Sequence, residues 1–267
     1  MILAVCGGNG GVGVSTLAYE VAGALDAVVV DADLAVADLP VGRGPDLHDV
    51  LAGRAAPLEA IRGGPVAVLQ CGRSLAGARG VDTGRLADAI RAVASHHDAV
   101  LDCPTGVGSD TGVPLAVADA CVVVVATRRW AVPGAVRVRA LADEVDTPVV
   151  AAALCGARGR DGSVPTGDAE PSTGDGDAPG SGAPAGGPSA GVGPATVREL
   201  LGVPVVRVPS TPTLSDSLRG GEPVTDRRPE STAAEAVASL AGRVERTRHA
   251  HEAVDERVPT HWTTANE

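Results

Sequence analysis

Seven short apolar runs recur along this chain of 267 residues, separated by stretches long enough to form helices. The runs are rich in valine and do not alternate polar with apolar positions, a pattern typical of strands buried on both faces of a sheet. They cover residues 2–6, 27–33, 66–72, 99–104, 120–127, 148–155 and 203–209. The spacing between them predicts helices over 15–25, 83–94, 135–144, 195–201 and 232 to about 246. Strands that alternate with helices indicate an α/β fold, a mostly parallel twisted sheet with helices on both faces.

The core of such a sheet has to be built almost without aromatic side chains. The chain has no phenylalanine, one tyrosine and one methionine, although 44% of its residues are hydrophobic. Valine, alanine and leucine must therefore fill the volume that aromatic side chains normally occupy. We expect the helices and strands to lie close together.

The chain is acidic and contains no lysine. The formal net charge is −11, and arginine supplies every permanently positive side chain. Such a surface is expected of a halophilic protein from a high-salt cytoplasm, where hydrated carboxylates tolerate strong screening. The same acidity argues against nucleic acid, or an anionic membrane surface, as the partner.

The five cysteines, Cys6, Cys71, Cys103, Cys121 and Cys155, form no CxxC pair and do not cluster with histidine. This pattern favours reduced thiols in the core of an intracellular protein over a metal or disulfide framework. No basic segment precedes an apolar run at the N-terminus, and no apolar stretch approaches the roughly 20 residues of a membrane span. We therefore expect a cytoplasmic protein.

Residues 157–193 differ in composition from the rest of the chain. Gly, Pro, Ser, Asp and Ala dominate, and two valines are the only larger apolar residues, too few to offset the entropy lost on ordering. We predict a disordered insertion in a single domain formed by residues 1–156 and 194–247, followed by a polar tail over 248–267. Trp262 in that tail is interpreted as an isolated exposed aromatic, with an anchor for a partner as the alternative.

The sequence GGNGGVGVST, residues 7–16, lies between the first predicted strand and the first predicted helix. Gly10, Gly11 and Gly13 allow backbone N–H groups to turn toward an anion, and the following helix directs its N-terminal dipole at the same place. Ser15 or Thr16 falls where a hydroxyl binds Mg²⁺ in phosphate-binding loops. By itself a glycine-rich turn of this kind is weak evidence for such a site.

Three aspartates strengthen the prediction. Asp31 and Asp33 lie two residues apart at the predicted end of one strand, and therefore on the same face, while Asp102 ends another strand. The carboxyl ends of parallel strands meet at one crevice, where open α/β sheets bind their ligands. A glycine loop and three carboxylates in that crevice predict a site for a nucleotide and a metal ion.

On these motifs the sequence resembles the MinD/ParA family of deviant Walker A ATPases, most closely its MinD branch, over nearly the whole chain. The family's loop reads GKGGVGKTT where this chain has GNGGVGVST at 8–16. Further similar segments are DADLAVADL at 31–39, HDAVLDCPTG at 97–106, ADACVVVVAT at 118–127 and LGVPVVRVPSTPTLSDSLRGGEPV at 201–224. The resemblance implies a P-loop NTPase fold and a regulator of cell division or intracellular positioning that binds ATP with Mg²⁺.

The resemblance also assigns roles to individual residues. It implies that Ser15 and Asp102 hold Mg²⁺, Asp102 through water, and that Asp33 helps to position the attacking water. The switch regions would contain Asp31, Asp33, Asp102 and Gly106. The nucleotide-binding residues would be Gly10, Gly11, Val12, Gly13, Val14, Ser15 and Thr16 in the loop, with Pro209 and Ser210 beside the base.

The chain departs from the family where the family carries positive charge. Asn9 replaces the signature lysine that reaches a partner's nucleotide across a dimer, and Val14 replaces the lysine that neutralises the β- and γ-phosphates. The family's Asn-Arg pair at the base falls at Cys155 and Gly156. Loss of an ionic contact in a partly buried site costs about 2–5 kcal/mol, and phosphoryl transfer depends on positioning and charge. We therefore predict weak nucleotide binding and negligible hydrolysis.

Two functions stay open. One is a MinD/ParA-like nucleotide-binding regulator with a protein partner, a second copy or a paralogue, and without the basic amphipathic helix that would attach it to a membrane. The other is a non-enzymatic pseudo-ATPase module that acts on an intact paralogue or another protein. Arg73, Arg128 and Arg129 follow predicted strands at the crevice and are candidates to replace the missing lysines, although solvent-exposed surface arginines are the favoured interpretation.

Overall fold

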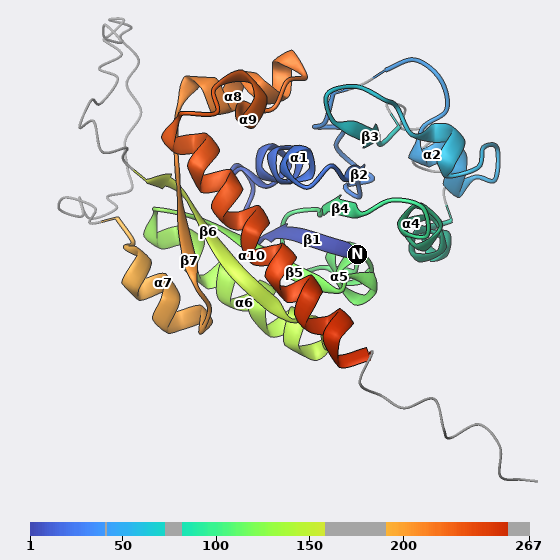
Figure 1. The fold of residues 1–267 in the computed structure, drawn as a ribbon. Helices are drawn as coiled ribbons and strands as arrows, with labels where there is room; N and C mark the ends of the chain where they lie inside the picture. The colour runs from blue at the N-terminus through green and yellow to red at the C-terminus, as the bar shows by residue number, and fades with distance from the viewer. Residues whose placement is uncertain (41, 73–81, 158–190, 256–267) are drawn as a thin grey trace, which may run out of the picture.

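A seven-stranded parallel sheet forms the centre of the molecule (Figure 1). The structure, a computed structural model, describes residues 1–40, 42–72, 82–157 and 191–255. The strand order is β3-β2-β4-β1-β5-β6-β7, and every neighbouring pair is parallel. The strands are β1 (Ile2–Gly7), β2 (Val28–Asp31), β3 (Ala67–Leu69), β4 (Ala99–Asp102), β5 (Ala120–Ala126), β6 (Val149–Ala157) and β7 (Val205–Pro209). All seven predicted strands are confirmed. Among them, β1, β2 and β4 are buried along their whole length, as their continuous apolar runs require.

Helices cover both faces of the sheet, as predicted (Figure 1). One face carries α1 (Val14–Ala24) and α10 (Thr232–Asp255), with α8 (Pro212–Gly220) and α9 (Val224–Arg227) beside α1. The other face carries α4 (Leu86–Ala94), α5 (Ser109–Val117), α6 (Val132–Glu144) and α7 (Pro194–Leu201). The short helix α2 (Leu47–Leu51) lies near β3 and α4. The described residues also form three 3₁₀ helices: η1 (Leu58–Ala60), η2 (Thr83–Arg85) and η3 (Arg129–Ala131).

The helical spacing did not predict α8, nor did it predict α2, α5 and α9. Both α2 and α9 are too short to show a helical period in the sequence. The sequence of α5 contains Gly112 and Pro114, which disfavour the interior of a helix. These three elements therefore depend on their packing in the fold.

The core contains the small side chains that the composition requires. Its largest fully buried side chains are Tyr19, Ile90, Glu20 and a set of leucines. Elements approach closely where both partners are glycine: a Cβ atom on Gly8 or Gly134 would overlap the backbone of the other residue. The first turn of α6 therefore packs directly against the loop that follows β1, as expected of a core without large aromatics.

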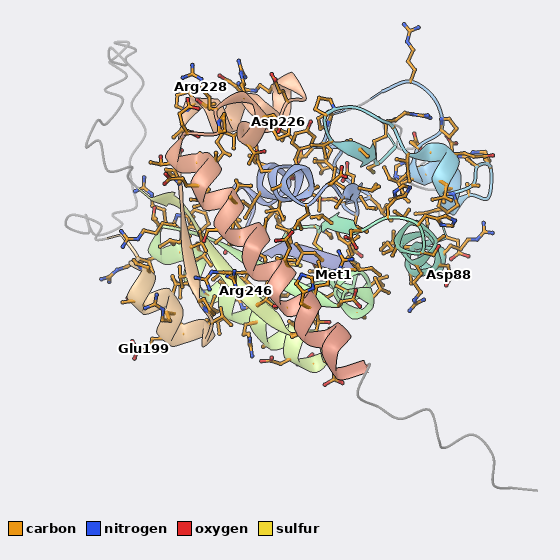
Figure 2. All side chains as sticks on the ribbon, viewed as in Figure 1. Met1, Asp88, Glu199, Asp226, Arg228 and Arg246 are labelled. Atoms are coloured by element: carbon orange, nitrogen blue, oxygen red, sulfur yellow. The ribbon has the colours of Figure 1, made fainter. Side chains whose placement is uncertain are left out.

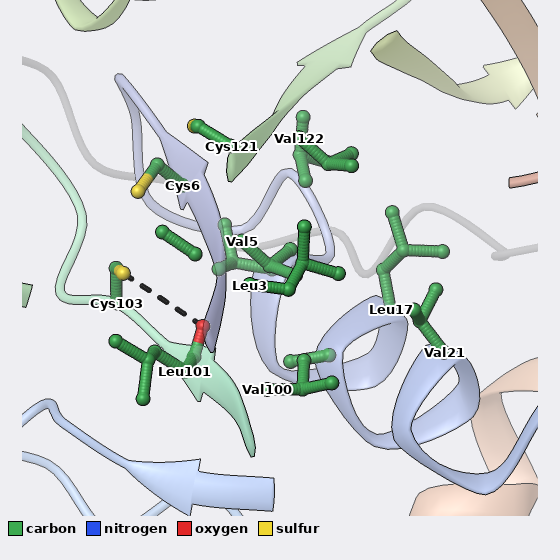
Figure 3. Close-up of a cluster of buried hydrophobic side chains, with 14 of the residues drawn as sticks. Leu3, Val5, Cys6, Leu17, Val21, Val100, Leu101, Cys103, Cys121 and Val122 are labelled. Atoms are coloured by element: carbon green, nitrogen blue, oxygen red, sulfur yellow. Dashed lines mark hydrogen bonds between the residues drawn. The ribbon is translucent and has the colours of Figure 1, made fainter. Parts of the chain in front are cut away.

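Three cysteines lie side by side in this core (Figure 3). Cys6 of β1 and Cys121 of β5 are fully buried, and the Cys103 thiol donates to the Leu101 carbonyl oxygen at 3.7 Å. Hydrogen bonds with Cys103 and Cys121, together with burial, raise the pKa of the Cys6 thiol well above its usual value. The three thiols are buried and behave as small core side chains. Cys71 is also buried and Cys155 is half-buried, and all five cysteines are free.

The C-terminal helix is longer than the sequence predicted. It was expected to end near Arg246, with a polar tail from residue 248, but α10 continues to Asp255. Asp98 contacts the turn of α10 that follows Arg246. Its carboxylate accepts hydrogen bonds from Arg248 at 2.6 Å and from the Met1 ammonium group at 2.6 Å. Figure 2 labels Met1, which lies beside α10 at this end of the sheet. A contact between residues far apart in the sequence therefore joins this polar part of the helix to the start of the chain.

Most of the predicted insertion, and Trp262 in the predicted tail, lie outside the described residues. At the edges of the insertion, Ala157 belongs to β6, and the Val192 amide donates to the Thr127 carbonyl oxygen at 2.9 Å. Both residues are therefore hydrogen-bonded parts of the described fold. None of the helices that the structure describes combines the length and apolar character of a membrane span.

Candidate functional site

The glycine loop connects β1 to α1 in a conformation that an anion site requires. Gly11 and Gly13 have φ angles of 72° and 97°, in the left-handed region that glycine tolerates best. Gly13 caps α1, and among the described residues no side chain accepts a hydrogen bond at this cap and no acidic residue lies in the first turn. The first N–H groups of α1 are therefore available to an anion, which the helix dipole also favours.

Val14 belongs to the core and not to the surface of the loop. It is 4% exposed, and a Cβ atom on Gly7 would overlap its side chain. Val12 is likewise buried and close to Gly7. The position at which the family carries a phosphate-binding lysine is therefore filled by an apolar side chain that packs under the loop.

Asn9 lies against the first turn of α6. A Cβ atom on Gly134 would overlap Asn9 Oδ1, and this buried oxygen has no hydrogen-bond partner among the described residues. An amide carries no charge, so Asn9 supplies neither the charge nor the reach of a lysine. Neither position of the loop that departs from the family therefore presents a cation.

Asp31 and Asp102 lie side by side where β2 and β4 end, since the two residues are register partners. Asp31 Oδ2 accepts the Cys71 amide at 3.3 Å, whereas Asp31 Oδ1 and Asp102 Oδ2 are buried without partners in the described structure. Burial, with the Asp102 charge next in importance, raises the pKa of Asp31 to about 8. Burial also raises the pKa of Asp102 to about 7, opposed by a hydrogen bond from Ser15. The predicted convergence of Asp31, Asp102 and the loop is thus present in the structure.

Asp33 corrects part of the prediction. It was expected to share a strand face with Asp31, but β2 ends at Asp31 and Asp33 lies in the turn beyond it. There its Oδ1 accepts the Ala35 and Val36 amides at 3.1 and 3.2 Å. The charge of Asp33 still contributes to the raised pKa values of Asp31 and Asp102, so it lies near the site without belonging to the strand.

A cavity of about 210 Å³, here named the α1–α8 pocket, opens beside the loop. Its walls carry apolar and hydroxyl groups and no charged side chain, which suits an uncharged ring such as a base. It is smaller than the roughly 300–1,000 Å³ of pockets that enclose a whole ligand, so phosphates would lie outside it, along the loop. The lining residues are Gly11, Val12, Gly13, Thr16, Leu17, Cys155, Val208, Pro209, Ser210, Thr211, Leu214 and Ser215.

Six of the predicted nucleotide-binding residues line this pocket, and three do not. Gly10, Val14 and Ser15 are absent from its walls, and Ser15 instead meets Asp102. The Gly106 amide donates to the Gly7 carbonyl oxygen at 3.0 Å, which brings the predicted switch glycine to the start of the loop.

The arginines proposed to replace the lysines are not joined to the loop by any described contact. Arg128 and Arg129 are exposed after β5, and Arg73 lies outside the described residues. Cys155 stands where the family has a base-contacting residue, and it lines the pocket. A Cβ atom added to Gly13 would lie 4.0 Å from the Cys155 sulfur. The pocket wall is therefore apolar at this point.

The pocket residues at the start of α8, and a pair of residues behind Asp31, were not predicted from the sequence. Thr211 is the N-cap of α8, where its hydroxyl accepts a hydrogen bond from the Leu214 amide at 3.2 Å. The Thr-Pro pair at 211–212 is a helix-start signal from which this side of the pocket could have been predicted. His48 Nε2 lies 3.4 Å from Cys71 Sγ and 3.1 Å from the Leu34 carbonyl oxygen. Burial, followed by the Asp31 charge, raises the pKa of Cys71 to about 12, so Cys71 is a packed thiol and not a nucleophile.

Comparison with known proteins agrees with this architecture. The chain matches no family model. An uncharacterised ATP-binding protein of Methanocaldococcus jannaschii is 27% identical over 259 residues, which cover 91% of this chain and 86% of that protein.

Two solved structures share the fold. The cell division ATPase MinD of Pyrococcus furiosus has a TM-score of 0.74 at 22% identity and covers 92% of this chain and 98% of its own. The septum site-determining protein MinD of Pyrococcus horikoshii, solved with Mg-ADP, has a TM-score of 0.73 at 20% identity and covers 91% and 95%. The fold implied by the resemblance is thus confirmed: this chain has the P-loop fold of the MinD/ParA ATPases.

Proposed function

We propose that this protein is a MinD/ParA-like regulator that binds a purine nucleotide with Mg²⁺ and hydrolyses it weakly or not at all. The observation that carries the proposal is the α1–α8 pocket, which opens next to the bare N-terminus of α1 and the Ser15–Asp102 pair. An uncharged pocket beside an anion-binding helix start matches the two parts of a nucleotide. The likeness to a MinD structure that contains Mg-ADP supports the same conclusion.

The residues at the strand ends fit a magnesium ion. The described residues contain no cluster of three His, Cys, Asp or Glu side chains that would hold a metal alone. Magnesium, however, usually takes one or two carboxylates together with water and substrate phosphates. Ser15 and Asp102, with the unpartnered Asp102 Oδ2, would provide the protein ligands, and the bound ion would neutralise phosphate charge.

Hydrolysis is expected to be slow because the loop presents no cation. Val14 is buried in the core and Asn9 lies against α6, so neither can stabilise charge on a transferred phosphoryl group. This observation also favours the second function, a pseudo-ATPase module that acts on a paralogue or another protein. In both cases we propose a single cytoplasmic domain with a protein partner and a role in cell division or positioning.

Titration with Mg-ATP, in molar KCl, of the wild type and the Val14→Lys variant tests nucleotide binding. We expect the lysine to raise affinity about 100-fold by restoring an ionic contact to phosphate. Val136→Lys is the matched control, since Val136 is 39% exposed on α6 and the substitution adds the same charge outside the lining of the pocket. Equal affinity of the wild type and Val14→Lys, with both variants folded, would show that the missing lysine does not limit binding.

Turnover separates the two functions. We expect phosphate release by the wild type to remain at the background rate, and the Asp33→Ala variant to be indistinguishable from it. A measurable rate that Asp33→Ala abolishes would exclude the pseudo-ATPase and assign Asp33 a catalytic role. Absence of any Mg-ATP or Mg-ADP binding would instead exclude the nucleotide-binding regulator.

A further inference from the structure

The structure holds a buried carboxylate that the proposed site does not use. Glu20, in the middle of α1, is 0% exposed. None of the salt bridges formed by the described residues includes Glu20. The charged side chain that affects its pKa is another acid, Asp226. A glutamate is rarely buried without a cation, because transfer of a carboxylate from water is costly.

Hydrogen bonds join Glu20 to the two helices that follow β7. Glu20 Oε2 accepts the Val224 amide of α9 at 2.8 Å, and Glu20 Oε1 is hydrogen-bonded to the Ser217 hydroxyl of α8. Ser217 is also 0% exposed, and its Oγ donates to the Leu214 carbonyl oxygen at 2.8 Å. One side chain of α1 therefore meets both α8 and α9.

A proton count indicates the charge state of this group. A serine hydroxyl has one proton, yet Ser217 Oγ lies within hydrogen-bond distance of two oxygens, Leu214 O and Glu20 Oε1. If Glu20 is a carboxylic acid, its own proton goes to Ser217 Oγ and the serine proton goes to Leu214 O, so every group is satisfied. Burial, as the largest cause, raises the pKa of Glu20, and the hydrogen bonds from Ser217 and the Val224 amide oppose that rise. The neutral acid fits both the geometry and the apolar surroundings.

The link lies one helical turn behind the α1–α8 pocket. Glu20 follows the lining residues Thr16 and Leu17 by four and three positions on α1, so it lies on the same side of the helix. Ser217 follows the lining residue Leu214 by three positions on α8. We propose that Glu20, hydrogen-bonded to Ser217 and the Val224 amide, is the positioning residue that sets the width of the base pocket.

This proposal, which rests on the proposed function, predicts different effects on binding of the base and on binding of the phosphates. Glu20 holds the wall formed by α8, whereas the phosphate loop is shaped by Gly11, Gly13 and the start of α1. Loss of the link should therefore weaken binding of a ligand that has a base and leave binding of a bare polyphosphate unchanged. A residue that only stabilised the fold would affect both ligands equally.

Mg-ADP and magnesium tripolyphosphate are the two probes, titrated against the full chain and four variants. Glu20→Ala and Ser217→Ala remove the link from either side, and we expect each to lower Mg-ADP affinity about tenfold with tripolyphosphate affinity unchanged. Glu20→Gln should keep wild-type affinity, because its amide donates to Ser217 and accepts from Val224 as the neutral acid does. Val21→Ala, at another fully buried position of α1, controls for general loosening and should affect both ligands equally or not at all.

Hydrogen exchange of the α8 amides gives a readout that needs no ligand. Faster exchange over residues 214–220 in Glu20→Ala, with wild-type exchange in Glu20→Gln, supports the link even if the wild type binds neither probe. Absence of binding to both probes would reject the proposed nucleotide site and leave the link intact. Unchanged α8 exchange in both alanine variants overturns the inference. So does weakening by Glu20→Gln as large as by Glu20→Ala, or an equal loss of affinity for both probes.

Discussion

Two groups of buried acids in this molecule differ in how completely they are hydrogen-bonded. At the ends of β2 and β4, Asp31 and Asp102 each have a buried carboxylate oxygen without a partner in the described structure. In α1, both oxygens of Glu20 are hydrogen-bonded, to Ser217 and to the Val224 amide. Burial is the largest cause that raises the pKa of all three acids. Burial alone therefore does not separate these two groups of acids, whereas unmet hydrogen-bonding capacity does.

This difference has an energetic basis. A buried polar atom without a partner costs free energy that only a ligand, an ion or water can recover. The aspartates lie beside the loop and the bare start of α1, where a ligand could do so. Glu20 is closed off between helices and already satisfied, so it serves the fold and, through α8, the shape of the pocket.

The largest effect is expected from Asp31→Asn. Since the folded pKa of Asp31 is about 8 and its ordinary value 3.8, its contribution to stability is fully present below about pH 4 and lost as pH rises through about 8. The free energy of unfolding of the wild type should therefore fall between about pH 4 and pH 8, by on the order of 3 kcal/mol, and Asp31→Asn should remove much of that fall. Urea unfolding at constant salt measures it, with the exposed Asp88→Asn as control. A variant less stable than the wild type at the higher pH would contradict this view of Asp31.

A smaller effect is expected from Asp102→Asn, which sharpens the assignment to magnesium. Nucleotide affinity measured with and without Mg²⁺ should differ about tenfold in the wild type and hardly at all in the variant, because one carboxylate ligand is lost. The ligand-free variant should be more stable than the wild type near pH 8, since burial and neighbouring acids already raise the pKa of Asp102 to about 7. Full retention of the Mg²⁺ dependence would place the ion elsewhere.

The smallest effect is expected from Glu20→Gln. A glutamine can reproduce every hydrogen bond of the neutral acid, so the free energy of unfolding at about pH 5 should stay within about 0.5 kcal/mol of the wild type. Chemical denaturation measures it, with Glu20→Ala as the destabilised reference. A gain as large as that of Asp31→Asn would mean that Glu20 is also a strained acid, and the contrast between the two groups would disappear.

The sequence predicted those parts of the site that depend on local pattern. Continuous apolar runs predicted all seven strands, and parallel strands bring their carboxyl ends together whatever the details of packing. The convergence of Asp31, Asp102 and the glycine loop followed from that rule alone. Asp33 was misplaced because the period-2 argument holds only while the strand continues, and β2 ends two residues earlier.

Other features could not be predicted because they join residues that are distant in the sequence. Glu20 and Ser217 are 197 positions apart, and Asp98 and Arg248 are 150 apart. No periodicity connects such pairs, although the first joins α1 to α8 and the second joins Asp98 to α10 beyond Arg246.

By itself, then, the sequence determined the α/β sheet, the phosphate-type loop and the absence of lysine at positions 9 and 14, because these follow from residue type and local spacing. Only the tertiary structure decided that Val14 packs in the core, that Asp31 and Asp102 keep unpartnered oxygens, and that Glu20 is fully bonded. Burial and hydrogen-bond completion are properties of the surroundings that the folded chain gives each residue. Carboxylic acids of the same chemistry therefore differ in how completely they are hydrogen-bonded, according to which elements enclose them.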